Sequence, residues 1–215
     1  CGIHGGDGGV LFYQEFSRLL PLDRPFLAIE APDLSSSEEI RIPSVEATAE
    51  KYVAILRRSR PHGPYLLTGY SFGGVVAYEM ARQLVEAGEE VPFLGLLDIL
   101  NPAVEVRAYS LAERVSVFWS AHREQPLLGR FGKLAARFRN GVETNLRVKS
   151  EVAMARRSEP AEAHSELRRV QLREAHHRAM KAYVPRPFPG ELTLFRADSV
   201  NDKFECPADY GWGGL

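Results

Sequence analysis

The stretch Gly69-Tyr70-Ser71-Phe72-Gly73 constrains the fold more than any other part of the sequence. The apolar run Tyr65–Tyr70 predicts a strand before it, and Phe72–Ala87 predicts a helix after it that ends at Gly88. Ser71 therefore lies on a sharp turn from strand to helix, with glycines that let the two elements approach closely. The alternative interpretation is an ordinary turn in which the serine only caps the helix.

In this context the Gly-x-Ser-x-Gly pattern predicts that Ser71 is a catalytic nucleophile. A serine hydroxyl needs a base to take its proton and hydrogen-bond donors to hold the developing oxyanion. The N–H of Phe72 is the first expected donor, because it lies at the N-terminus of the following helix. The second is expected from His4-Gly5-Gly6-Asp7-Gly8-Gly9, in which four glycines let backbone N–H groups face a ligand. A phosphate-binding loop is the alternative, but the Gly-x-Gly-x-x-Gly spacing is absent.

The rest of the first hundred residues also alternates between strand and helix, with short connections. Helices are predicted at Val10–Leu20 and Val45–Leu56, and strands at Phe26–Ala31 and Val91–Leu97. This alternation predicts an α/β fold in which a mostly parallel sheet is flanked by helices.

The alternation stops after Asn101-Pro102. Residues from about Ser110 to Lys181 predict helix without strand, beginning at the capping box Ser110-Leu111-Ala112-Glu113, and a strand returns at Leu192–Ala197. A helical insertion at this place is typical of a lid over an active site. We therefore expect one domain, 1–215, with a helical lid insertion at 103–182.

Composition excludes several classes of function. The net charge of −1, with 45% apolar and 26% charged residues, gives no basis for binding nucleic acid or an anionic membrane. No apolar run approaches the roughly 20 residues of a transmembrane helix, and we expect no signal peptide. Cys1 and Cys206 form no metal-binding pattern, so no metal site is expected and a cytoplasmic location is the default.

The acid that would orient a catalytic histidine is expected where a later strand ends. Asp98 ends the strand that follows the Ser71 helix, and Asp198 ends the strand after the insertion. Both are candidates from the pattern alone, and Asp98 could instead cap the first turn of the insertion.

These motifs together resemble the thioesterase domains at the C-terminus of nonribosomal peptide synthetases and polyketide synthases, which have the α/β-hydrolase fold. The matching stretches run in family order over nearly the whole chain: Ile3-His4-Gly5-Gly6, Val10-Leu11-Phe12-Tyr13, Gly63-Pro64-Tyr65, Gly69–Gly74, Leu96-Leu97-Asp98, Asn101-Pro102, Tyr183-Val184-Pro185-Arg186-Pro187 and Leu194-Phe195-Arg196-Ala197.

The resemblance implies site residues as well as a fold. It favours Asp98 over Asp198 as the acid and places the second oxyanion donor at Gly6, although the family often has Pro-Ala where this chain has Gly5-Gly6. It places the catalytic histidine after a segment like Asp209–Leu215, so we expect this base, with the last strand and helix of the fold, beyond Leu215. Within the chain, His176-His177 is the one pair to test as an alternative.

The implied function is a serine thioesterase that releases an acyl, polyketide or peptidyl chain from a carrier protein, by hydrolysis or cyclisation. The substrate would be carried on the phosphopantetheine of an acyl or peptidyl carrier domain in the same polypeptide, and the thioesterase domain itself would need no cofactor. Alternatives are a free-standing editing thioesterase or esterase acting on small acyl groups, and an inactive carrier-binding module.

Two features of the insertion bear on its substrate. Apolar residues there, with Tyr70 beside the serine, are predicted to contact the acyl group or simply to pack between helices: Leu111, Val115, Phe118, Leu134 and Phe138. The segment between His122 and Lys181 contains about fourteen Lys and Arg residues but only about seven Asp and Glu residues. This local excess of positive charge predicts either docking of an acidic carrier protein or ordinary solvated helix faces.

Overall fold

The computed structural model describes residues 1–21, 23–31, 42, 44–121, 123, 126, 160–197 and 205–214. These residues belong to two compact units. The first contains Cys1–Val104, Arg168–Ala197 and Pro207–Leu215, and the second contains Glu105–Leu167 and Asp198–Cys206. Each unit is described by itself.

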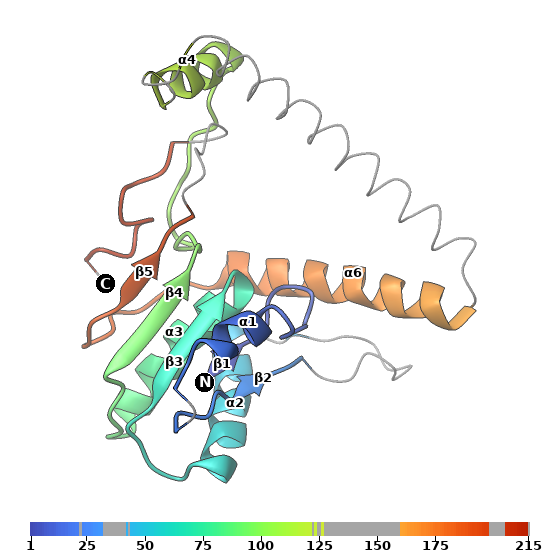
Figure 1. Ribbon diagram of the computed structural model, residues 1–215, viewed down its shortest axis with the longest axis vertical. Coiled ribbons are helices and arrows are strands. Elements are labelled where there is room, and N and C mark those ends of the chain that lie inside the picture. Colours follow the sequence, from blue (N-terminus) through green and yellow to red (C-terminus); the bar gives the residue numbers. More distant parts are fainter. Residues whose placement is uncertain are drawn as a thin grey trace. The chain divides into compact units, whose positions relative to one another are not determined.

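The first unit is built on a sheet of five parallel strands among the described residues, in the order β2-β1-β3-β4-β5 (Figure 1). The strands are β1 (Gly2–Ile3), β2 (Ala28–Ile29), β3 (Leu66–Tyr70), β4 (Phe93–Leu97) and β5 (Thr193–Phe195). Because all five are parallel, their carboxyl ends meet at one edge of the sheet. This confirms the predicted mostly parallel sheet.

Helices flank this sheet as the alternation predicted. They are α1 (Tyr13–Arg18), α2 (Val45–Ser59), α3 (Phe72–Glu86) and the part of α6 (Pro160–Ala182) that begins at Arg168. Ser44 caps α2 by accepting a hydrogen bond from the N–H of Ala47 at 3.1 Å. Gly88 follows α3 with a φ of 80°, which is the left-handed conformation expected of a glycine after a helix.

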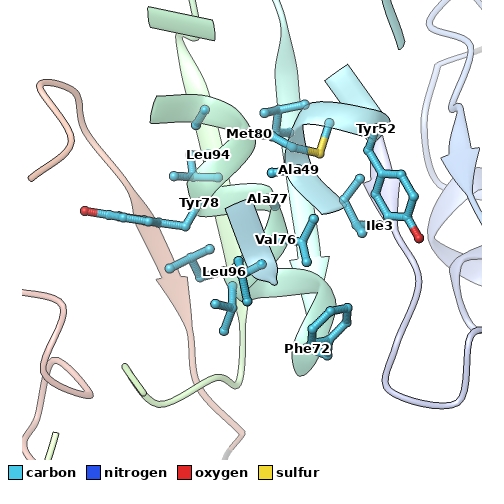
Figure 2. Packing of buried hydrophobic residues seen from close by; sticks show 14 of the residues in the cluster. Ile3, Ala49, Tyr52, Phe72, Val76, Ala77, Tyr78, Met80, Leu94 and Leu96 are labelled. Atoms are coloured by element: carbon cyan, nitrogen blue, oxygen red, sulfur yellow. The ribbon is translucent and has the colours of Figure 1, made fainter. Parts of the chain in front are cut away.

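Helix α3 forms the centre of the hydrophobic core. Figure 2 shows its side chains gathered with those of the strands and of α2, including Ile3, Tyr52, Leu94 and Leu96. Nearly every residue of α3 is buried, so this helix is covered on almost all sides rather than on one face alone. Its N-terminal residue, Phe72, is only 2% exposed.

A buried charged cluster on α3 joins it to the end of α6. Glu79 is 1% exposed and accepts hydrogen bonds from Arg82 at 2.6 and 2.9 Å and from the Tyr183 hydroxyl at 2.8 Å. Burial alone would raise the pKa of Glu79, but these hydrogen bonds and one from Gln83 hold it below its usual value. Removing one partner would leave a buried charge unpaired, which is strongly destabilising.

Several predicted elements are shorter in the structure, among them the strand predicted at Leu192–Ala197, which is Thr193–Phe195. The helix predicted at Val10–Leu20 is confined to Tyr13–Arg18, because Val10 and Leu11 accept turn hydrogen bonds from Tyr13 and Gln14. The strand predicted at Phe26–Ala31 is only Ala28–Ile29, because it pairs with the two-residue strand β1.

The second unit contains α4 (Leu111–Ala121), and the capping box predicted there is confirmed. The Ser110 N–H donates to Glu113 Oε2 at 2.8 Å, and the Glu113 N–H donates to Ser110 Oγ at 3.3 Å. Leu134 and Phe138 lie outside the described residues. The lid boundaries 103–182 stay a prediction.

A glycine at the start of α3 allows this helix to contact β1 and the loop after it. A Cβ on Gly73 would collide with the carbonyl oxygen of His4 and lie 2.6 Å from the carbonyl oxygen of Ile3. Both are rigid backbone atoms, so no side-chain rearrangement relieves the clash.

We therefore expect Gly73→Ala to lower the free energy of unfolding by more than about 2 kcal/mol, as overpacking against backbone does. Gly9→Ala is the matched control, because its nearest neighbour would be Asp7 Oδ1 at 4.0 Å, and its effect should stay within about 1 kcal/mol. Urea denaturation measures both. Equal stabilities for the two variants would contradict the close packing of Gly73.

Candidate active site

Ser71 occupies the turn between β3 and α3 in a conformation that few residues other than glycine adopt. Its φ is 54° and its ψ is −127°. Such a backbone costs on the order of 1–3 kcal/mol and persists only where its surroundings enforce it. Its side chain makes no capping hydrogen bond to α3, so the alternative of a simple capping serine is not what the structure contains.

The carboxyl ends of three neighbouring strands bring most predicted site residues together. Gly69 pairs with Ile3, and Tyr70 pairs with Leu97, so His4, Ser71 and Asp98 each follow the end of an adjacent strand. A Cβ on Gly69 would collide with the carbonyl oxygen of Gly73, so the turn between them is as tight as the sequence predicted.

Asp98 is held at this edge by the strand and the chain on its other side. It also has a positive φ, of 48°, and its N–H donates to the carbonyl of Phe195 at 2.7 Å. Its Oδ1 accepts hydrogen bonds from the Ala197 N–H at 3.1 Å and the Tyr210 hydroxyl at 3.2 Å. The guanidinium of Arg196 lies 4.4 Å from the centre of the Tyr210 ring and holds that ring in place. Asp198, the rival acid, lies outside the described residues.

The loop after β1 presents the other predicted oxyanion donor. Gly8 donates to the carbonyl of Gly5 at 3.0 Å, and Asp7 Oδ1 accepts from the N–H of Gly9 at 3.2 Å, which folds the loop into a compact turn. Among the described residues, no acceptor takes the N–H of Gly6 or of Phe72. Their role as oxyanion donors stays a prediction.

Four of the six histidines have described side chains, and none of these four makes a hydrogen bond to Ser71 or Asp98. His4 and His176 are buried beside the loop, His62 lies in an exposed turn with Nδ1 3.3 Å from Glu89 Oε1, and His177 is exposed. The side chains of His122 and His164 lie outside the described residues.

The predicted substrate contacts divide between the two units. Tyr70 is 45% exposed in the first unit, and the centre of its ring lies 5.5 Å from that of Phe12, which the sequence analysis did not predict to contact substrate. In the second unit Leu111 and Val115 are exposed on α4, whereas Phe118 is buried. Their contact with substrate stays a prediction.

Other classes of site find no support in the described part of the chain. There, no three His, Cys, Asp or Glu residues are grouped so that they could hold a metal ion. None of the helices described combines the length and the apolar character that crossing a membrane requires.

Known proteins share both the sequence and the fold. "Inactive atromentin synthetase invA6" of Paxillus involutus is 40% identical over 97 residues, which are 45% of this chain and 10% of that protein. "Non-reducing polyketide synthase ntnG" of Nectria sp is 42% identical over 106 residues, 49% of this chain and 5% of that protein. The chain therefore spans a tenth or less of the length of these curated relatives.

Among solved structures, the NocB thioesterase domain in covalent complex with a fluorophosphonate nocardicin G analog is 26% identical, with a TM-score of 0.59. That match covers 90% of this chain and 68% of the NocB chain. It confirms the α/β-hydrolase type of fold, and the relatives confirm the resemblance to synthetase thioesterase domains. The thioesterase domain family matches residues 1–126, more than half of the sequence, and this chain belongs to that family.

Proposed function

We propose that this chain releases an acyl, polyketide or peptidyl chain from the phosphopantetheine thioester of a carrier domain, through an acyl-Ser71 intermediate. The observation that carries the proposal is the strained turn at Ser71, one strand away from Asp98 and beside the N–H of Phe72, for which the described residues provide no acceptor. Family membership supports the thioester as substrate.

In the proposed first step, Ser71 Oγ attacks the thioester carbonyl carbon while a base accepts the hydroxyl proton. The carbonyl oxygen becomes an oxyanion that accepts hydrogen bonds from the N–H groups of Gly6 and Phe72. Collapse of this intermediate breaks the C–S bond, the pantetheine thiol leaves with the proton, and the acyl group remains on Ser71. Water, or a hydroxyl or amine of the acyl chain itself, then attacks the ester and frees Ser71.

The base is proposed to be a histidine whose Nδ1–H is held by Asp98, which would fix its tautomer and stabilise the imidazolium. Asp98 suits this role because Oδ1 is already anchored by Ala197 and Tyr210, so the carboxylate cannot rotate freely.

An inactive carrier-binding module is the second candidate. Its support is that several relatives, "Inactive atromentin synthetase invA6" among them, are named inactive, and that no described histidine side chain makes a hydrogen bond to Ser71. The experiments below separate the two candidates.

The first prediction concerns the nucleophile. In the protein expressed at its full natural length, a fluorophosphonate should label Ser71, and Ser71→Ala should abolish labelling and lower turnover by about 10⁶-fold. Ser59→Ala, at the exposed end of α2, is the matched control and should keep both. Mass spectrometry of the labelled peptide identifies the serine. A label that persists in Ser71→Ala would remove the assignment, and an unlabelled wild type would favour the inactive module.

The second prediction concerns the acid. Asp98→Asn should lower kcat roughly 10⁴-fold, because the histidine would be held in the wrong tautomer. The fold should survive, since the asparagine oxygen can still accept from Ala197 and Tyr210. Steady-state kinetics on an acyl-pantetheine thioester, with circular dichroism as the control for folding, measure this. If Asp198→Asn proves the more damaging change, Asp98 is not the acid.

The third prediction concerns carrier docking by the basic insertion. Reversal of three exposed basic residues of α6 should lower kcat/KM for a carrier-bound substrate and leave a short neutral thioester unaffected: Arg169→Glu, Arg178→Glu and Lys181→Glu. The loss should shrink at high salt, because the screening length falls from about 8 Å at physiological salt to about 3 Å at 1 M.

The matched control makes the same change of charge on exposed residues outside the insertion: Arg24→Glu, Lys51→Glu and Arg58→Glu. It should affect both substrates alike. If the α6 reversals also affect both substrates alike, the excess of basic residues is an ordinary solvated surface.

A further inference from the structure

One buried histidine touches both residues that are proposed to hold the oxyanion. His176 on α6 is 1% exposed, and its Nδ1 lies 2.9 Å from the carbonyl oxygen of Gly6. Its ring stacks on that of Phe72, with ring centres 3.9 Å apart and planes inclined by 16°. A single side chain of α6 thus contacts both the loop after β1 and the start of α3, which are far from α6 in the sequence.

The hydrogen bond fixes the tautomer of His176. A carbonyl oxygen only accepts, so Nδ1 carries the proton and Nε2 has a bare lone pair. Burial lowers the pKa of His176 to about 4; the Gly6 carbonyl and Asp7 oppose this shift, and His4 adds to it. The ring is therefore neutral near pH 7.

Nε2 of His176 is buried and has no hydrogen-bond partner among the described residues. Leaving such an atom unsatisfied costs stability, and an apolar side chain of the same shape would avoid that cost. Packing against Phe72 alone would thus be served better by phenylalanine or leucine. The feature that only the histidine supplies is the donor to Gly6.

A second buried histidine holds the preceding peptide. His4 Nδ1 lies 2.6 Å from the Gly5 carbonyl oxygen, and its Nε2 accepts from the Tyr52 hydroxyl at 2.6 Å. In a trans peptide the C=O and the next N–H point in opposite directions. Fixing the Gly5 carbonyl therefore directs the N–H of Gly6, and fixing the Gly6 carbonyl stops the following peptide from rotating. Glycine would otherwise allow such rotations at little cost.

The position of His176 is itself set by the buried cluster of α3. Tyr183, seven residues after His176, donates to Glu79, which lies seven residues after Phe72. Seven residues are about two helical turns, so the two contacts hold this part of α6 alongside α3 in a defined register.

We propose that His176 is a positioning residue of the oxyanion hole: its Nδ1–H fixes the peptide that follows Gly6, so that the Gly6 N–H held by His4 on the other side cannot swing away, and its ring supports Phe72. Both N–H groups are then aligned before substrate binds. This inference rests on the proposed function of Ser71.

Two variants separate positioning from packing. His176→Asn retains an N–H donor near the position of Nδ1 but loses the ring, whereas His176→Phe retains the ring but loses the donor. His62→Phe, which changes an exposed histidine in the turn after α2, is the matched control and should keep wild-type activity. Each is made in the protein at its full natural length and assayed on an acyl-pantetheine thioester, with the free energy of unfolding measured in urea.

If His176 positions the hole, His176→Phe should lower kcat by about 10²-fold with little change in KM, since an oxyanion contact acts only in the transition state. His176→Asn should recover most of kcat although it is the less stable protein. The order of activities would then oppose the order of stabilities.

If the two orders agree, with His176→Phe the more active variant, His176 only packs and the proposal is overturned. Failure of the proposed function gives a different result, because wild-type protein would then neither turn over the thioester nor be labelled at Ser71. That outcome removes the oxyanion hole itself, and it is seen before any His176 variant is compared.

Discussion

The site depends on the close contact of α3 with the end of β1 at Gly73. With no Cβ between them, the backbone of the helix meets the carbonyls of Ile3 and His4 directly. This contact places the first N–H groups of α3 next to the loop that begins at His4. A larger residue would push the two apart, because its Cβ would collide with the carbonyl oxygen of His4, and the two N–H groups would no longer be aimed at the same atom.

The sheet adds the remaining geometry through register. Tyr70 pairs with Leu97 and Leu97 pairs with Phe195, so the chain leaves three parallel strands at the same level. Asp98 and Ser71 are each the first residue beyond their strand, and both have a positive φ. The chain therefore turns at the end of each strand instead of continuing along it, and the two side chains stay at the edge of the sheet.

The sequence predicted the local parts of this arrangement well. The strand, turn and helix around Ser71, the glycine after α3 and the capping box at Ser110 all follow from residues close to one another in the chain. Apolar spacing overestimated the helix at Val10–Leu20, because exposed apolar residues in a turn, such as Leu11 and Leu19 here, can have the same spacing as residues on a helix face.

Contacts between distant segments could not be predicted in this way. The Tyr210 hydroxyl reaches Asp98 from 112 residues away, and His176 reaches Gly6 from 170 residues away. The sequence marked His176 only as a possible base, since nothing in its own helix indicates that its hydrogen-bond partner is the carbonyl of Gly6. The contact of His176 with Gly6 arises from the packing of α6 against the loop after β1, and a pattern along one helix contains no information about it.

The strained backbone of Ser71 favours a particular substitution at this position in a domain whose chemistry is no longer needed. Its φ of 54° and ψ of −127° lie near the mirror image of polyproline II, a region that glycine enters freely and serine does not. Glycine at position 71 would therefore give a more stable fold that lacks the hydroxyl. Without selection for the reaction, free energy alone favours the loss of this side chain, so a serine that stays in this conformation is maintained against the stability of its own domain.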